Sequence, residues 1–240
     1  MSSEPHPDTG QPVGPAVDAT PAGRPEAVTL TGRFGRVEKL KAAHAASLWD
    51  GLKDHIRVWT YMPSYGPFTE AEPFAAWIAQ RAGLEDPYCY VVIDKDEKAR
   101  GILALMALRP EHRVCEIGNI LYAPALQRTP LATEAQYLVA RYAFETLRYR
   151  RYEWKCDALN AASRRAAQRF GLTFEGIFRQ HMIARGRNRN SAWYAMTDDE
   201  WPARKRAFER WLAPENFDAD GNQRESLSAL NGVTGAKTGS

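Results

Sequence analysis

The chain has 240 residues, of which 44% are hydrophobic and 25% are charged, with a formal net charge of +3 and a pI near 8.7. This length allows one domain with a sizeable core, or two small domains. The net charge is too small to argue for nucleic-acid binding by itself, and no apolar run approaches the roughly 18 residues that a membrane helix needs. The N-terminus lacks a basic segment followed by an apolar one, so no signal peptide is expected.

The three cysteines, Cys89, Cys115 and Cys156, lie in apolar, strand-like segments. An odd number without Cys-x-x-Cys spacing argues against a disulfide framework and against a zinc site. We interpret them as buried, reduced thiols of a cytoplasmic protein that holds no metal.

The two ends of the chain differ in composition from the middle. Residues 1–27 are rich in Pro, Gly, Ala and Thr and contain no aromatic residue, and in residues 214–240 Phe217 is the only one. Such segments bury too little surface to offset the entropy of ordering them. We therefore expect a disordered leader at 1–27, a folded domain at 28–213 and a disordered tail at 214–240.

The first half of the folded part mixes strand and helix patterns. A strand or hairpin is expected at 28–31 and 36–39, and a helix at 42–55. A second helix is expected from Thr69, because Glu72 three residues later completes a capping box. Three consecutive strands follow, at 88–94, 101–108 and 114–123.

The second half continues the mixture. In order, we expect a helix at 133–148, a strand at 152–157, a helix at 161–170, a hairpin of strands at 173–185 and 191–196, and a helix after Asp199. Consecutive strands in the middle and helices on either side predict an α+β fold, with a mostly antiparallel sheet and helices on its faces.

The strand at 114–123 carries a carboxylate. Regular alternation places Glu116, Gly118, Ile120 and Tyr122 on one face of the sheet. Pro124 then ends the hydrogen-bonded ladder, because proline has no N–H to donate.

A turn rich in hydroxyl groups leads from this strand into the next helix. Arg128 adds positive charge, and Thr129 and Thr133 add hydroxyls. Backbone N–H groups at the helix start face outward at the positive end of the helix dipole. The pattern predicts a site for a phosphate-bearing ligand, with an ordinary joint capped by threonines as the alternative.

Three short motifs occur in order along the chain. Gln127, Pro130 and Ala132 stand at the places of a Gln/Arg-x-x-Gly-x-Gly/Ala motif, and Glu116 lies eleven residues before Gln127. Further on, Asn160-Ala-Ala-Ser is followed by Phe-Gly-Leu at 170–172. In this combination the chain resembles the GCN5-related N-acetyltransferases (GNAT), especially the branch similar to the ribosomal-protein N-acetyltransferases RimJ and RimL. The resemblance covers residues 28–201.

The resemblance implies the GNAT fold, a mixed and mostly antiparallel sheet flanked by helices, with splayed strands that form an acetyl-CoA cleft. It also implies direct transfer of an acetyl group from acetyl-CoA to a primary amine, without a covalent acyl-enzyme. The acceptor would be a protein N-terminus or a small-molecule amine. A non-catalytic acyl-CoA sensor of the same fold, and an enzyme that uses a longer donor such as succinyl-CoA, are the alternatives.

The resemblance also assigns roles to residues. Glu116 would be the general base and Ser163 the acid that protonates the leaving thiolate, with a structural carboxylate and a helix cap as the alternatives. Many relatives have a tyrosine where this chain has Ala167, so that role is not carried over. The coenzyme would contact Ile120, Leu121, Tyr122, Gln127, Arg128, Thr129, Leu131, Ala132, Thr133, Asn160 and Ser163. The acceptor would contact Trp59, Tyr61, Met62 and His181.

Pro130 departs from the motif, because relatives usually have glycine there. Proline donates no hydrogen bond, so we infer that Thr129, Thr133 and Arg128 take over part of the anion binding. The expected partners are acetyl-CoA and an amine. Neither a membrane nor nucleic acid is expected, and a homodimer is left open.

Overall fold

A single eight-stranded sheet runs through the body of the protein in this computed structural model, which describes residues 3–233. The strand order is β3-β4-β5-β6-β7-β8-β10-β9, and every neighbouring pair is antiparallel except β7 and β8, which are parallel. The strands are β3 (Leu30–Thr31), β4 (Gly35–Lys39), β5 (Tyr88–Asp94), β6 (Ala99–Arg109), β7 (Val114–Tyr122), β8 (Arg151–Asp157), β9 (Thr173–Ala184) and β10 (Arg187–Thr197).

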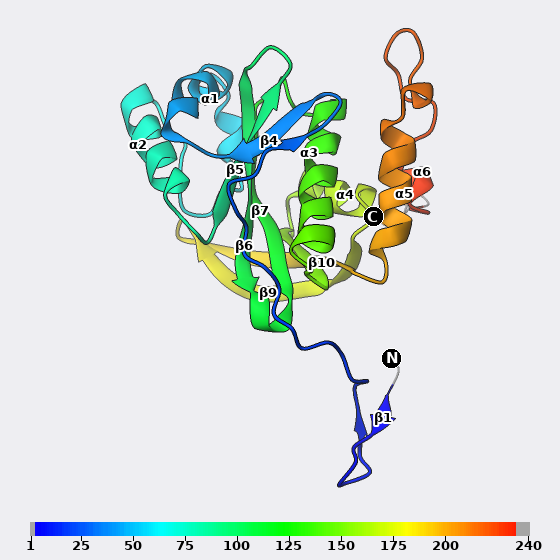
Figure 1. The fold of residues 1–240 in the computed structure, drawn as a ribbon. Coiled ribbons are helices and arrows are strands. Elements are labelled where there is room, and N and C mark those ends of the chain that lie inside the picture. Colours follow the sequence, from blue (N-terminus) through cyan, green and yellow to red (C-terminus); the bar gives the residue numbers. More distant parts are fainter. Residues whose placement is uncertain (1–2, 234–240) are drawn as a thin grey trace.

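Helices cover both faces of this sheet (Figure 1). Leu105 and Ile117 belong to one core, which the sheet shares with α3, α4 and α5, while Ala104 and Leu121 belong to a second core beneath α1 and α2. The helices are α1 (Ala45–Leu52), α2 (Ala71–Ala82), α3 (Pro130–Arg141), α4 (Ala161–Arg169), α5 (Trp201–Leu212) and α6 (Leu227–Leu230). Short 3-10 turns lie at Ala42–His44, Ile56–Trp59, Pro110–His112 and Pro214–Asn216, and a π-helical turn, Tyr142–Thr146, extends α3.

The predicted α+β class and the mostly antiparallel sheet are confirmed, but two helix starts differ from the sequence expectation. The capping box at Thr69 does not form, because α2 begins at Ala71 and its N-cap, Glu70, makes no side-chain cap bond. Helix α3 begins three residues before the predicted Thr133, because Thr129 caps it and Pro130 suits the first helical position.

Strand β7 is interrupted by a bulge, which corrects the predicted alternation of its side chains. Asn119 has a φ of 50°, and the register with β6 shifts between Gly118 and Leu121. After the bulge, Ile120 and Tyr122 pack against the same core as Ile117 and no longer share a face with Glu116.

The bulge coincides with the separation of β7 from β8. The parallel register between these strands extends only from Val114 opposite Arg151 to Glu116 opposite Glu153. Beyond Glu116 the two strands diverge, and the gap between their ends is the place where a ligand can enter the sheet.

The N-terminal flank is more ordered than its composition suggests. Two short strands, β1 (Glu4–Pro5) and β2 (Pro12–Val13), pair away from the sheet (Figure 1). Closer to the domain, Ala22 is buried in the core and Gly23 N–H donates to Leu147 O at 2.8 Å. The leader therefore contacts the domain through backbone hydrogen bonds that composition does not reveal.

The C-terminal flank also differs from the expected disorder. Leu227 of α6 is fully buried, and the Asn216 amide donates to Trp211 O at 3.0 Å and Glu225 O at 3.1 Å. Its Oδ1 accepts Glu225 N–H at 2.9 Å. One buried side chain thus satisfies three backbone groups and fixes the segment after α5. The parts of the disorder prediction at residues 1–2 and 234–240 lie outside the described residues.

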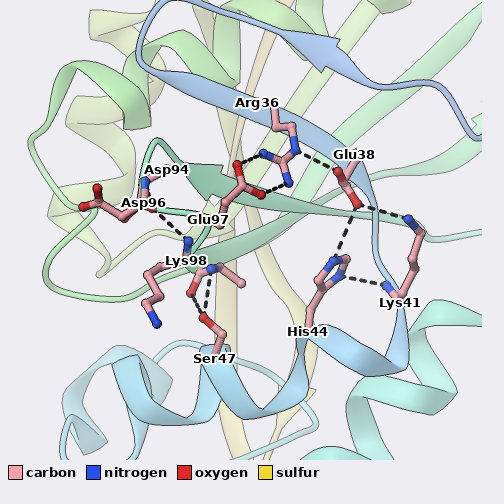
Figure 2. Close-up of polar contacts among 10 residues, drawn as sticks. Arg36, Glu38, Lys41, His44, Ser47, Asp94, Asp96, Glu97 and Lys98 are labelled. Carbon is pink, nitrogen blue, oxygen red and sulfur yellow. Dashed lines mark hydrogen bonds and ion pairs between the residues drawn. The ribbon is translucent and has the colours of Figure 1, made fainter.

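A polar network joins α1 to the edge of the sheet (Figure 2). Arg36 on β4 donates to both carboxylate oxygens of Glu97 at 2.6 Å, and to Glu38 at 2.9 Å. Ser47 on α1 accepts the N–H of Ala99, where β6 begins, at 2.9 Å. Exposed ion pairs add little stability, so we interpret these contacts as fixing the position of α1 on the sheet.

Across the described residues, none of the helices is long and apolar enough to span a bilayer.

The packing of residues 214–233 can be tested with Asn216→Ala. We expect the free energy of unfolding to fall by about 1–3 kcal/mol, because buried backbone groups lose their partners. Amide exchange at 214–233 should accelerate, whereas Asp220→Ala, an exposed change in the same segment, should alter neither quantity. Unprotected amides in this segment of the wild-type protein would contradict the packing.

Candidate active site

A cavity of about 1220 Å³ opens where β7 and β8 diverge. Its walls come from the ends of these two strands, the start of α3, one side of α4, the segment after α1 and the residues after α5. It places the loop before α3 and the carboxylate of β7 in one continuous space. The predicted site residues that line it are Tyr61, Met62, Glu116, Ile120, Tyr122, Gln127, Arg128, Thr129, Ala132, Thr133, Asn160, Ser163 and His181.

Three predicted residues are buried in the cores instead. Leu121 packs under α1 and α2, and Leu131 packs against the opposite face of the sheet. Trp59 lies in an aromatic cluster, with ring centroids 5.5 Å from Phe68 and 5.8 Å from Trp77. These three residues therefore belong to the cores and are not among the residues that line the cavity.

The loop before α3 has an internally bonded structure. The Thr129 hydroxyl accepts Ala132 N–H at 3.2 Å and donates to Leu126 O at 2.7 Å. Pro130 has no N–H and Ala132 N–H is capped, so of these first residues of α3 only Leu131 has an N–H without a capping bond among the described residues. The sequence-based role of Thr129 in anion binding is therefore revised, because its hydroxyl is already used within the protein.

Positive charge gathers around this helix start. Arg128, Arg165 and Arg169 all line the cavity, and none of them has a carboxylate partner within the residues that the structure describes. Three unpaired guanidinium groups around a helix N-terminus favour a ligand with several negative charges.

Arg169 is the most buried of the three and was not predicted. Its Nη1 donates to the Thr133 hydroxyl at 3.0 Å, and its guanidinium lies 4.9 Å from the Trp211 ring and 5.4 Å from the Phe170 ring. Burial lowers the pKa of Arg169, as it does for a cation without an anionic partner. The spacing of four from Arg165 puts both arginines on one side of α4, and that signal was available in the sequence.

The residues after α5 form another part of the wall that the sequence analysis missed. Phe217, Asn222, Gln223 and Ser228 line the same end of the cavity as Arg169. Phe217 packs on Trp211 with ring centroids 5.3 Å apart. The segment expected to be a disordered tail thus belongs to the candidate site.

Glu116 lies at the opposite part of the cavity in an ion pair. Its Oε2 is 2.6 Å from Lys155 Nζ, and only 6% of the residue is exposed. Burial raises the pKa of Glu116, and the positive charge of Lys155 opposes this effect. Lys155 itself lies 4.2 Å from the centre of the Trp193 ring. The result is a carboxylate that is shielded from water, faces a ligand-sized space and is held by one cation.

The start of α4 positions the second candidate group. Asn160 is the N-cap, and its Oδ1 accepts Ser163 N–H at 3.1 Å. The Ser163 hydroxyl accepts the Trp154 indole N–H at 3.0 Å. The hydroxyl also lies in hydrogen-bond range of the Cys156 thiol, where it opposes the burial that raises the pKa of that thiol.

His181 lies on the hairpin that closes the Glu116 end. Its Nδ1 is 2.9 Å from Ser191 Oγ, and its ring packs against Phe178 and Trp193. Partial burial lowers the pKa of His181, with further contributions from the charges of Lys155 and Arg189, so the neutral ring is favoured. Among residues 3–233 no group of three or more His, Cys, Asp or Glu side chains has a metal-binding arrangement.

Comparisons with known proteins agree with this architecture. Residues 36–173 match the family model described as "Acetyltransferase (GNAT) domain". A GCN5-related N-acetyltransferase from Brucella melitensis is 44% identical with a TM-score of 0.86, and the match covers 89% of this chain and 98% of that one. A structure from Chromobacterium violaceum, described as a probable acetyltransferase of the GNAT family, is 38% identical with a TM-score of 0.74, covering 81% and 100%.

A more distant structure shares the fold. The ribosomal-protein-S5-alanine acetyltransferase from Vibrio fischeri is 16% identical with a TM-score of 0.60, over 72% of this chain and 98% of that one. No curated protein gives a significant match. The family match and the close structures show that the chain belongs to the GNAT acetyltransferases, whose general activity is acyl-CoA-dependent acetyl transfer.

The unpaired arginines give a direct test of coenzyme binding. Arg169→Gln should weaken the binding of CoA by about tenfold to a hundredfold, because a hydrogen bond to a charged group contributes about 1.5–3 kcal/mol. Isothermal titration calorimetry measures the change. The control Arg206→Gln removes the same charge from the exposed side of α5 and should bind as the wild type does. Equal affinities of all three proteins would exclude Arg169 from the site.

Proposed function

We propose that the protein transfers an acetyl group from acetyl-CoA to a primary amine by direct attack, without a covalent acyl-enzyme. The observation that carries this proposal is the layout of one cavity, with unpaired arginines at one part and a buried carboxylate at another. Family membership supplies the donor, and the layout fits a polyanionic coenzyme whose reactive end reaches Glu116.

Each part of the coenzyme has suitable partners in the cavity. Acetyl-CoA supplies an activated acyl group as a thioester. Arg128, Arg169 and the Leu131 N–H would bind its phosphates, and the divergent edge of β7 would hold its amide-containing arm. The side-chain amide N–H groups of Asn160 complete this surface, since only its Oδ1 is used in capping.

Glu116 would accept the proton that the attacking amine must lose. An α-amine has a pKa near 8 and a lysine amine near 10.4, so a base assists at neutral pH. The neighbouring Lys155 keeps the carboxylate anionic in spite of its burial. The backbone at Ile120, which has no register partner on β6, would offer an N–H to the thioester oxygen.

Ser163 would donate a proton to the sulfur as the C–S bond breaks. Trp154 fixes the hydroxyl oxygen, and the proton would turn from the neighbouring Cys156 sulfur to the sulfur of the coenzyme. Cys115 is not a candidate nucleophile, because complete burial raises the pKa of its thiol far above the usual range.

Protein N-termini belong in the panel of amines for two reasons. A carboxylate base such as Glu116 can deprotonate an α-amine more readily than a lysine amine, because the pKa of the α-amine is closer to neutrality. In addition, the structure from Vibrio fischeri that shares the fold is named for a ribosomal-protein substrate. Succinyl-CoA should be compared with acetyl-CoA as the donor.

Replacement of the base is the first test of the mechanism. Glu116→Gln should lower kcat by about 10²- to 10⁴-fold, the usual contribution of a general base, while CoA still binds. Because the protonated carboxyl cannot accept a proton, the wild-type rate should also fall as the pH drops through the raised pKa of Glu116. Steady-state assays from pH 5 to 9 measure both effects.

The matched control for this substitution is Glu175→Gln. Glu175 on β9 pairs with Arg151 outside the cavity wall and, unlike Glu153, forms no ion pair with Lys155. This control variant should retain the kcat of the wild type within a few-fold. Full activity of Glu116→Gln would refute the catalytic assignment, and binding of acetyl-CoA without turnover of any amine would favour a sensor.

Ser163→Ala tests the acid. The thiolate of coenzyme A is a weak base, so we expect a smaller loss of about tenfold in kcat. Ser163→Thr, which keeps the hydroxyl, should recover part of this loss. If alanine and threonine variants are equally impaired with unchanged CoA affinity, Ser163 acts only as part of the α4 cap.

A further inference from the structure

The acceptor end of the cavity lies on a sheet face where most charges are paired. The registers place Glu116, Glu153, Lys155 and Trp193 on this face. Lys155 pairs with Glu116 at 2.6 Å, and Glu153 pairs with Arg151 at 2.9 Å and with Arg109 at 3.1 Å. These contacts compensate the charges of both carboxylates.

Arg189 on β10 is a charged residue at this end of the cavity that has no such partner. It lines the cavity together with Glu116, Lys155 and His181, and its side chain is partly buried. Its Nε is buried without a hydrogen-bond partner, and within residues 3–233 no carboxylate lies in ion-pair range of its guanidinium. A desolvated donor of this kind is costly unless a ligand supplies an acceptor.

The position of Arg189 relative to the base is shown by its effects on neighbouring groups. Its positive charge opposes the burial that raises the pKa of Glu116 and helps to lower the pKa of His181, and both of these residues line the cavity with Arg189. Arg189 therefore lies close to the place where the amine must sit, and apart from the arginines at the start of α3.

The hairpin that carries Arg189 strengthens this charge. Between Gly176 and Thr197 the sequence contains four arginines and no acidic residue. Arg185 at its turn donates to Tyr65 O and Gly66 O, both at 2.6 Å, and this holds the hairpin against the segment that follows α1. The hairpin that carries Arg189 is thus basic and held in place, and Arg189 is its arginine that lines the cavity.

We propose that Arg189 binds a carboxylate or similar oxyanion of the acceptor, so that the substrates are primary amines carrying a negative group near the amine. This inference rests on the proposed acetyl transfer and narrows its acceptor. Polyamines and aminoglycoside-like amines, which bring only positive charge, are disfavoured beside this surplus cation.

Matched pairs of acceptors test the proposal. Phenylalanine is compared with phenethylamine, and leucine with 3-methylbutylamine, because each pair differs only in the carboxylate. Short peptides with Asp or Asn at the second position form the other arm, in which the anion comes from a side chain. Initial rates with acetyl-CoA give kcat/KM for each acceptor, and the arm with the larger effect identifies the source of the carboxylate.

The variants Arg189→Gln, Arg189→Lys and Arg187→Gln separate this role from general charge. Arg189→Gln should lower kcat/KM for the anionic acceptors by about tenfold to a hundredfold, mainly through KM, and affect the neutral members much less, through the pKa of Glu116 alone. Arg189→Lys should restore part of the loss. Arg187 is exposed on the same strand outside the cavity wall, so Arg187→Gln should behave as the wild type.

Binding of the reaction product provides a readout independent of turnover. N-acetylphenylalanine should bind to the wild type in the presence of CoA more tightly than its amide does, and Arg189→Gln should abolish the difference. Equal use of charged and neutral acceptors, or an equal loss for both in Arg189→Gln, would overturn this inference and leave acetyl transfer intact. Failure of every acceptor, with no product binding, would contradict the proposed function itself.

Discussion

The separation of β7 from β8 after Glu116 is the constraint on which the candidate site depends. Two parallel strands that stayed paired would fill the middle of the sheet and leave no entry for a ligand. The bulge at Asn119 turns Ile120 and Tyr122 toward the α3 side, while Glu116 keeps its place on the other side. The cavity therefore opens where an irregularity in β7 coincides with the end of its pairing to β8, and the carboxylate lies at that point.

Charge then divides the cavity into regions. Arginines without carboxylate partners surround the start of α3, and a paired carboxylate lies where the strands part. A further cation without a carboxylate partner among the described residues, Arg189, lies on the hairpin beyond Glu116. In a partly buried space such unpaired charges are tolerated when a ligand supplies the opposite charge, and their positions are the basis for the proposed polyanionic donor and anionic acceptor.

Much of this arrangement could be predicted from the sequence, because its motifs are local. The strand with Glu116, the loop with Gln127 and the cap at Asn160 each follow from neighbouring residues. The bulge could not be predicted, since regular alternation is the default for a strand and Asn119 gives little signal. The ion pair of Glu116 with Lys155 joins separate strands, and Asn216 orders a segment whose composition suggests disorder. Such long-range contacts appear only once the chain is folded.

The central claim is that the coenzyme occupies the gap between β7 and β8 with its phosphates at the start of α3. A crystal structure of the protein with CoA tests it most directly. The account predicts the arm of CoA along the divergent part of β7 and its phosphates within hydrogen-bond distance of Leu131 N–H and Arg169. CoA bound elsewhere, or a gap that stays closed to it at saturating concentration, would contradict the account.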